Sequence, residues 1–183
     1  MGRSKDRVAA IVMAAGQGKR LKSSLPKVLH LAAGRPLVGH VVSELHQIGS
    51  IDQIAIVVSA NQDGFRTALG ADAEKLTLAV QDPPNGTGDA ARVGVDALES
   101  GASLVLVLPG DTPLLTAETL SGAIDAHNSA GAAATVLTAR VPDATGYGRI
   151  VRDAAGDIAR SVEGEFDRVV VTKTSSECVE RLD

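Results

Sequence analysis

Residues 8–21 have the sequence VAAIVMAAGQGKRL, a short apolar run that leads into a glycine loop. The continuous apolar run Val8–Met13 is typical of a strand that is covered on both faces. The two alanines and two glycines after it allow the backbone to approach a ligand closely and to present N–H groups to it. The stretch therefore predicts a buried strand followed by a loop suited to contact a ligand.

Strand and helix patterns alternate along the chain after this loop. Strands are predicted at Ile54–Val58, Leu76–Val80, Leu104–Leu108 and Ala133–Ala139, and helices at residues 36–48, Asp63–Leu69, Thr87–Leu98 and Ala117–Ser129. This alternation predicts a Rossmann-like three-layer α/β sandwich with a mostly parallel sheet. Ligands of such sheets bind outside the carboxyl ends of the strands, so the loops after Met13, Val80 and Leu108 are the candidate site.

Composition limits the classes of protein that fit. The chain has 183 residues, which suits one domain, and apolar residues make up 44% but aromatic residues only 2%. The formal net charge of −4 argues against bulk binding to nucleic acid or to an anionic membrane. The single cysteine, Cys178, has no partner for an internal disulfide. No apolar run reaches the ~18 residues that span a bilayer, so we expect a cytoplasmic protein.

The glycine loop matches neither of the two common nucleotide fingerprints. Leu21 occupies the place of the third glycine of a dinucleotide motif, and no glycine stands where a Walker loop requires one. No acidic residue occurs between Arg7 and Ser43. The basic residues around the loop are Lys19, Arg20, Lys22, Lys27 and Arg35. An unpaired basic cluster at this edge would attract a polyanion such as a triphosphate. The alternatives are a plain strand–helix turn and a solvated face of ordinary lysines.

The loops after the third and fourth predicted strands carry the other polar candidates. QDPPNGTGDA, residues 81–90, is a Pro-Pro turn that leads into glycines at a helix start, where a planar or anionic group could bind. Its alternative is a helix start capped by Thr87. PGDTPLL, residues 109–115, places the carboxylate of Asp111 directly after a buried strand, a position suited to a hard cation. Its alternative is an Asp that caps a turn.

Three motifs together resemble the signature of the sugar nucleotidyltransferases: MAAGQGKRL at 13–21, LPKVLH at 25–30 and GRPLV at 34–38. Within that superfamily the chain most resembles the N-terminal uridyltransferase (pyrophosphorylase) domain of the bacterial bifunctional GlmU family. The resemblance implies Mg²⁺-dependent uridyl transfer from UTP to N-acetylglucosamine-1-phosphate, which gives pyrophosphate and UDP-N-acetylglucosamine, a peptidoglycan precursor. It implies small-molecule substrates and neither a nucleic-acid nor a membrane partner, and no sequence feature marks an oligomer interface.

The resemblance also implies a role for each matching residue. The substrate-binding residues would be Ala14, Ala15, Gly16, Gly18, Gln81, Gly86, Thr87, Gly148 and Glu163. Gln81, Gly86 and Thr87 would hold the uracil base, while Gly148 and Glu163 would contact the sugar. Arg20 and Lys27 would be catalytic, holding the triphosphate and bridging the two reactants. Asp111 would bind Mg²⁺.

The resemblance has two departures. Asp89 stands where the family usually has His. Residues 1–163 correspond to the nucleotidyltransferase domain, whereas the tail 164–183 does not match it and lacks the expected asparagines, which implies a chain shortened at its C-terminal end. Two other functions therefore stay open: a related enzyme that uses CTP or GTP with another phosphorylated acceptor, and a nucleotide-binding fragment without turnover.

Overall fold

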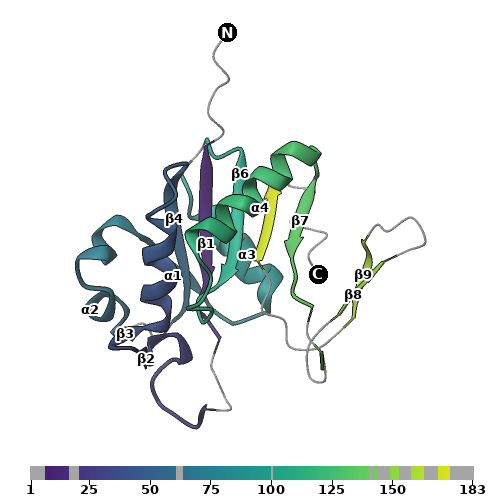
Figure 1. Cartoon of the computed structure of the whole chain (residues 1–183). Helices are drawn as coiled ribbons and strands as arrows, with labels where there is room; N and C mark the ends of the chain where they lie inside the picture. The colour runs from purple at the N-terminus through teal and green to yellow at the C-terminus, as the bar shows by residue number, and fades with distance from the viewer. Residues whose placement is uncertain are drawn as a thin grey trace.

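The computed structural model describes residues 7–16, 21–60, 64–99, 101–140, 142–143, 149–152, 158–162 and 169–173. Its centre is a six-stranded sheet in the order β5-β4-β1-β6-β10-β7 (Figure 1). The strands are β1 (Val8–Met13), β4 (Ile51–Ser59), β5 (Thr77–Gln81), β6 (Leu104–Pro109), β7 (Ala134–Leu137) and β10 (Val169–Lys173). β1 pairs in parallel with β4 and β6, and β4 with β5, whereas β10 is antiparallel to β6 and β7. The predicted mostly parallel sheet is confirmed.

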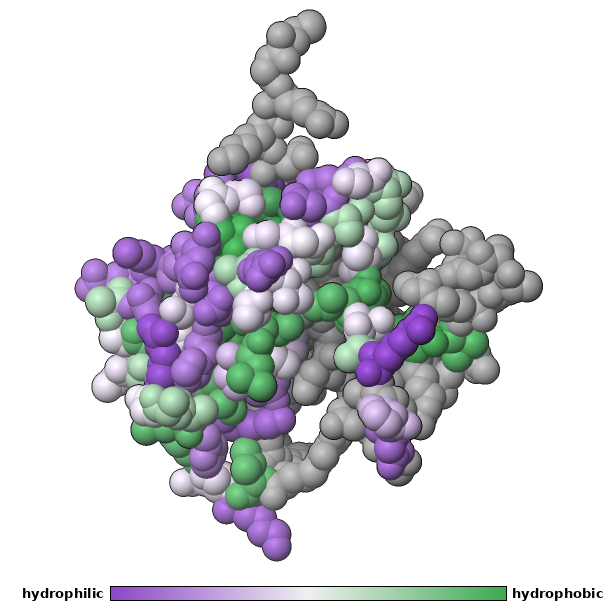
Figure 2. Space-filling view, in the orientation of Figure 1, coloured by the Kyte–Doolittle hydropathy of each residue, from purple (hydrophilic) through white to green (hydrophobic). Residues whose placement is uncertain are grey.

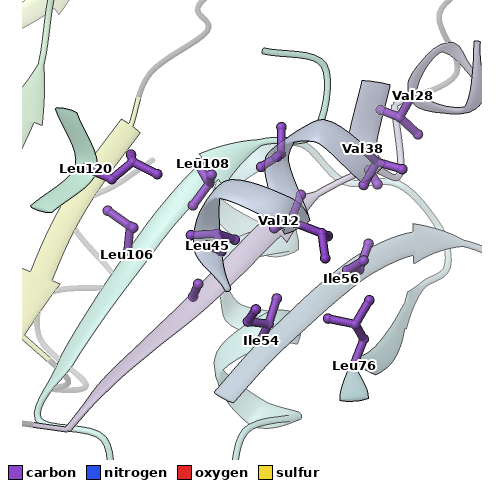
Figure 3. Packing of buried hydrophobic residues seen from close by; sticks show 14 of the residues in the cluster. Val12, Val28, Val38, Leu45, Ile54, Ile56, Leu76, Leu106, Leu108 and Leu120 are labelled. Atoms are coloured by element: carbon purple, nitrogen blue, oxygen red, sulfur yellow. The ribbon is translucent and has the colours of Figure 1, made fainter. Parts of the chain in front are cut away.

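One face of the sheet is covered by α1 (Leu37–Leu45), α2 (Phe65–Leu69) and α4 (Ala117–Ala130). Alternate residues of the strands point to this face, as expected from the period of a strand. Figure 3 shows Val38 and Leu45 of α1, and Leu120 of α4, packed over Val12 of β1 and Leu106 of β6. The core on this side is almost entirely aliphatic, as the composition predicted.

The opposite face carries α3 (Thr87–Asp96), whose small residues Ala90 and Ala91 pack on Ile11 and Val105. Gly94 allows α3 to lie close to β1, because a Cβ at this position would be 2.4 Å from Cγ2 of Ile11. With helices on both faces, the three-layer arrangement predicted from the sequence is confirmed.

The order of the strands creates a switch point beside β1. The chain passes from β1 through α1 to β4 on one side, whereas α3 leads from β5 to β6 on the other side. Loops therefore leave β1 and β6 in different directions, and the crevice outside their carboxyl ends is the usual ligand position in such sheets. Met13, the last residue of β1, lies opposite both Val57 and Pro109.

The predicted helices and strands are present with shifted ends. α1 starts after Pro36 as expected but ends at Leu45, and Ile48 beyond it is still buried. Thr87 is the first residue of α3 rather than its cap, because the capping position is held by Gly86 with φ +99° and no side-chain hydrogen bond. The interpretation of Thr87 as a helix cap is therefore wrong.

Several shorter elements were not predicted. Two 3-10 helices, η2 (Lys27–Leu29) and η3 (Gly70–Lys75), and the two-residue strands β2 (Leu31–Ala32) and β3 (Arg35–Pro36) lie in segments without clear periodicity. β8 (Arg149–Arg152) and β9 (Ile158–Val162) form a separate antiparallel pair. β10, in the segment after residue 163, lies inside the main sheet between β6 and β7.

Polar residues cover much of the helical face seen in Figure 2, mainly on its left side, and apolar groups show between them in the centre and the lower part. The most exposed large apolar side chains are Leu114, at 91%, and Leu31, at 67%. No helix in the described part of the chain is long and apolar enough to cross a membrane.

Candidate active site at the carboxyl edge of the sheet

At the switch point, backbone hydrogen bonds join the end of β1 to the loop after β6 and the loop after β1 to β4. The N–H of Gly110 donates to the carbonyl of Met13 over 2.9 Å, and the N–H of Ala14 donates to that of Val57 over 2.7 Å. The N–H of Ala14 is thus bonded to the sheet and is not available to a ligand. Ala15 and Gly16 have no hydrogen bond on their N–H groups from the residues that the structure describes, so these two donors can face a ligand.

Lys27 and Asp111 form an ion pair at this edge. Lys27 is the first residue of η2, and the buried side chains of Val28 and Leu29 anchor that short helix in the core. Asp111 follows β6 directly, and its side chain is only 12% exposed, whereas that of Lys27 is 45% exposed. The pair therefore joins a largely buried carboxylate to a cation that solvent and ligands can reach.

Gly110 makes this approach of η2 and the β6 loop feasible. A Cβ at this position would lie 3.1 Å from the carbonyl oxygen of Met13 and 3.3 Å from Cγ1 of Val28. Both distances are tighter than ordinary van der Waals contact, so a side chain here would push η2 away from the end of β6. Sequence reasoning used Gly110 only as a neighbour of Asp111 and missed this packing role.

The basic cluster predicted around the glycine loop is partly paired, which corrects the expectation that it is unpaired. Lys27 pairs with Asp111, and Arg35 lies 3.8 Å from a carboxylate oxygen of Asp72. Both acids come from segments distant in the sequence, so a local count of charges could not find them. The positive charge available at this edge is therefore smaller than the sequence indicated, and Lys27 already has a partner that a ligand must replace.

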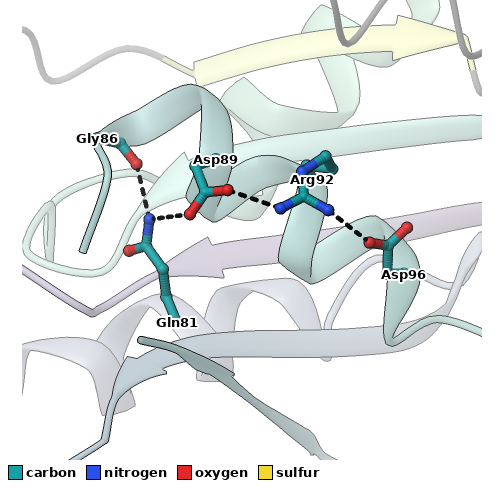
Figure 4. Close-up of polar contacts among 5 residues, drawn as sticks. All are labelled: Gln81, Gly86, Asp89, Arg92 and Asp96. Atoms are coloured by element: carbon teal, nitrogen blue, oxygen red, sulfur yellow. Dashed lines mark hydrogen bonds and ion pairs between the residues drawn. The ribbon is translucent and has the colours of Figure 1, made fainter. Parts of the chain in front are cut away.

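A second polar group lies where β5 meets α3 (Figure 4). Gln81, the last residue of β5, is only 3% exposed. Its Nε2 donates to the carbonyl of Gly86 over 3.0 Å and to Oδ2 of Asp89 over 2.8 Å. Asp89 accepts a second hydrogen bond, from Arg92 over 2.8 Å, and Arg92 also reaches Asp96 over 3.2 Å.

The charges in this group reinforce one another. The hydrogen bond from Gln81, and then that from Arg92, hold the pKa of Asp89 below its ordinary value. The hydrogen bond to Asp89 and its negative charge raise the pKa of Arg92. Asp89 is therefore an ionised carboxylate at neutral pH, and it can only accept hydrogen bonds. Sequence reasoning noted Asp89 as a departure but gave it no role; its place on the first turn of the helix that follows Gln81 was the available signal.

The described residues fit a cation shared with a substrate better than a metal cage. Within the described part of the chain, no three His, Cys, Asp or Glu residues come together as metal ligands. Mg²⁺ commonly takes one or two carboxylates and fills its other positions with water and phosphate oxygens. Asp111 already faces one cation, the ammonium of Lys27, so its carboxylate suits such a partial site.

The structure brings only some of the candidate residues into view. Ala14, Ala15, Gly16 and Asp111 follow β1 and β6, with Lys27 of η2 paired to Asp111. Gln81, Gly86 and Thr87 lie where β5 leads into α3. All of these positions are at the carboxyl edge of the parallel strands. The remaining candidates, Gly18, Arg20, Gly148 and Glu163, lie outside the described residues.

Comparisons with known proteins place the chain in a family. A family model described as the MobA-like NTP transferase domain matches residues 10–178. The chain is similar to the bifunctional protein GlmU of Streptomyces coelicolor, with 47% identity over 85% of this chain and 32% of the relative. It is also similar to the bifunctional protein GlmU of Brevibacillus brevis, with 45% identity over 86% of this chain and 33% of that relative. The chain spans about a third of the length of these curated relatives.

Solved structures show the same fold at lower identity. A Bacillus anthracis protein provisionally named a glucose-1-phosphate thymidylyltransferase superposes with a TM-score of 0.73 and 21% identity, over 91% of this chain and 71% of that one. The 4-diphosphocytidyl-2C-methyl-D-erythritol synthase of Anaerococcus prevotii superposes with a TM-score of 0.65 and 16% identity, over 93% of this chain and 72% of that one. These likenesses support the fold alone.

Proposed function

Because the chain belongs to the MobA-like NTP transferase domain family, and is thus a nucleotidyltransferase, we propose that it transfers a uridylyl group from UTP to N-acetylglucosamine-1-phosphate with the help of Mg²⁺. A phosphate oxygen of the sugar-1-phosphate attacks the α-phosphorus of UTP. The bond from that phosphorus to the bridging oxygen of the β-phosphate breaks, and pyrophosphate leaves with the electron pair. The products are UDP-N-acetylglucosamine and pyrophosphate.

The single observation that carries this proposal is the Lys27–Asp111 pair at the switch point. Two polyanions must approach each other in this reaction, so catalysis depends mainly on neutralising charge and aligning the reactants. Asp111 supplies a site for a cation, and Lys27 is a cation of the protein itself. Beside them are the N–H groups of Ala15 and Gly16, which have no hydrogen-bond partner among the described residues. An anion-binding and a cation-binding group side by side suit a metal–triphosphate complex.

Lys27 has the central part in this mechanism. When a nucleotide enters, the ammonium exchanges the carboxylate of Asp111 for phosphate oxygens, because its side chain is half-exposed and free to turn toward them. It then bridges phosphates of both reactants and offsets the negative charge that grows between them. Asp111, released from Lys27, would hold the Mg²⁺. Bound there, the metal would supply Lewis-acid stabilisation of the phosphate oxygens.

The remaining roles follow the order of the loops. Gln81, Gly86 and Thr87 contact the pyrimidine base, since they lie together where β5 leads into the N-terminus of α3. Ala14 contributes through its carbonyl or its small side chain, because its N–H is already bonded to Val57. Outside the described residues, we propose that Gly18 and Arg20 hold the triphosphate, and that Gly148 and Glu163 contact the sugar.

The experiment is pyrophosphate release from UTP with N-acetylglucosamine-1-phosphate, with and without Mg²⁺, run beside CTP, GTP and ATP. Release with UTP alone, and only with Mg²⁺, is the expected result. Release with CTP or GTP instead would favour a related transferase. Binding of UTP by folded protein without release would mean a nucleotide-binding chain, and the transfer reaction would be withdrawn.

A further inference from the structure

The side-chain amide of Gln81 has one defined orientation. An amide can usually be turned over, because its oxygen accepts and its nitrogen donates. Here both partners, the carbonyl of Gly86 and the carboxylate of Asp89, are acceptors only. The atom that faces them must therefore be Nε2, and its two N–H bonds are both used.

Only Oε1 of Gln81 is left for a ligand. No described residue donates a hydrogen bond to it, and it is not among the polar atoms sealed off from solvent in the described part of the chain. The residue as a whole is 3% exposed, so the amide has little room to rearrange. The site thus presents a hydrogen-bond acceptor and withholds the matching donor.

Of the two acceptors that fix the amide, Asp89 is the one contributed by a side chain. Its carboxylate is held in turn by Arg92 over 2.8 Å, and both hydrogen bonds keep its pKa low. A protonated acid could donate to Oε1 of a turned amide, but an ionised carboxylate cannot. At neutral pH Asp89 is therefore in the one state that requires Nε2 to face it, and Arg92 holds its carboxylate in place.

The two pyrimidines differ at the atom that such a group reads. Uracil carries an N–H donor at N3, whereas cytosine has an unprotonated nitrogen acceptor there. We propose that Asp89 is a positioning residue that sets base specificity: by holding Nε2 of Gln81 it leaves Oε1 to meet the base, which selects uracil over cytosine. This inference rests on the proposed function, because it assumes that Gln81 faces the base.

Removal of Asp89 should allow the amide to turn. With only Gly86 as partner, Gln81 loses half of its constraint, and its Nε2 can then donate to N3 of cytosine. An acceptor placed against an acceptor in a site shielded from water lowers affinity by roughly tenfold to a hundredfold. We therefore expect Asp89→Ala to lower the UTP to CTP affinity ratio by about tenfold or more, through weaker UTP binding and stronger CTP binding.

The test is calorimetric binding of UTP and of CTP to the whole chain, to Asp89→Ala and to the control Asp96→Ala. Asp96→Ala removes the other carboxylate on Arg92 and leaves the bonds of Gln81 intact, so its ratio should equal that of the wild type. A role of Asp89 in the stability of α3 alone would weaken both nucleotides by the same factor. An unchanged ratio in Asp89→Ala would therefore overturn the inference.

Binding separates this inference from the transfer reaction. A wild type that prefers UTP in binding but releases no pyrophosphate would sink the proposed function and leave the role of Asp89 standing. A wild type that binds neither nucleotide would overturn both.

NMR of the Gln81 side-chain amide provides a second test, which needs no ligand. Its NH₂ protons should exchange slowly with solvent in the wild type and in Asp96→Ala, and faster in Asp89→Ala. Equal exchange rates in all three proteins would contradict the proposal that Asp89 fixes the orientation of the Gln81 amide.

Discussion

The candidate site is built from two regions of opposite character. The first, which we call the exchangeable pair, is Lys27 and Asp111: two full charges from distant segments, one of them half-exposed. The second, the fixed network, is Gln81, Gly86, Asp89 and Arg92: a buried amide held by neighbours that lie close in the sequence. Both lie at the carboxyl edge of the same sheet.

The difference lies in what a ligand can displace. The cation of the exchangeable pair is half-exposed, so a ligand can reach it, and each partner can exchange the other for a ligand of the right charge. A buried amide with both N–H groups bonded costs more to rearrange, because every lost bond leaves a shielded polar group unsatisfied. We infer that the exchangeable pair serves the moving charges of the reaction, and the fixed network serves recognition of a part that does not change.

The largest effect is expected from Lys27→Ala, which breaks the exchangeable pair. We expect kcat/KM for pyrophosphate release to fall by about 10²–10³, as when a preorganised charge-stabilising group is lost. The free energy of unfolding should fall by about 1–3 kcal/mol, because the carboxylate of Asp111, whose side chain is only 12% exposed, loses its partner. Steady-state kinetics and urea unfolding on the same preparation measure both.

Lys75→Ala is the matched control for this variant. Lys75 is an exposed lysine at the last position of η3, just before the start of β5 and so on the opposite edge of the sheet. It should keep the kinetics of the wild type. Near-full activity in Lys27→Ala, with Lys75→Ala unchanged, would show that the bridging role assigned to Lys27 is wrong.

The two regions also differ in how far the sequence could predict them. The strands that end at Met13, Gln81 and Pro109 could be predicted from local apolar runs. Because ligands of parallel sheets bind outside the carboxyl ends of the strands, the loops that follow them could then be predicted as the site. The pairing of Lys27 with Asp111 could not be predicted from the residues, because it depends on β1 and β6 being neighbours, which no local pattern encodes. The same limit hid β10, whose place in the sheet depends on long-range pairing.

The fixed network was hidden for a different reason. Gln81 and Asp89 were both noticed in the sequence, but a hydrogen bond between them requires the turn at Gly86, where φ is +99°. Such a backbone conformation is open to glycine at little cost, and a glycine alone does not reveal which conformation it adopts. The contact is short in sequence and still depended on the three-dimensional turn.

An intermediate effect is expected from Gly94→Ala, which disturbs the packing of α3, the helix that carries Asp89 and Arg92 of the fixed network. The added Cβ would meet the buried Ile11 at 2.4 Å, so α3 must move away from β1. We expect a loss of about 1–3 kcal/mol in the free energy of unfolding, as for other overpacked cores. Because α3 carries Asp89, KM for UTP should rise while kcat, which depends on Lys27, stays near that of the wild type.

Gly122→Ala tests whether the effect comes from packing. Gly122 lies within α4, and an added Cβ there meets nothing within 4 Å. This variant should be as stable as the wild type or more stable by roughly 0.5–1 kcal/mol, because alanine favours a helix. Equal stability of Gly94→Ala and Gly122→Ala in urea unfolding would contradict the close approach of α3 to β1.

The smallest effect is expected in the pH dependence of the fixed network. The pKa of Asp89 is lowered in the folded chain from its ordinary value of 3.8, mainly by the hydrogen bond from Gln81. A lowered pKa means that the folded state favours the carboxylate, so Asp89 contributes to the stability of the folded state at pH values above its ordinary pKa. That contribution is lost as the pH falls below 3.8 and through the folded value. The stability difference between the wild type and Asp89→Ala should therefore be constant near neutral pH and shrink in acid.

Urea unfolding at a series of pH values from neutral to about 3 measures this difference. Other carboxylates also take up protons in this range, but their effect is common to both proteins and cancels in the comparison. Asp96→Ala controls for the general loss of a carboxylate from α3, since it keeps the bond between Gln81 and Asp89. If the difference for Asp89→Ala were the same in acid as at neutral pH, the carboxylate would not be the group that Gln81 holds, and the network would lose the fixed character that distinguishes it from the exchangeable pair.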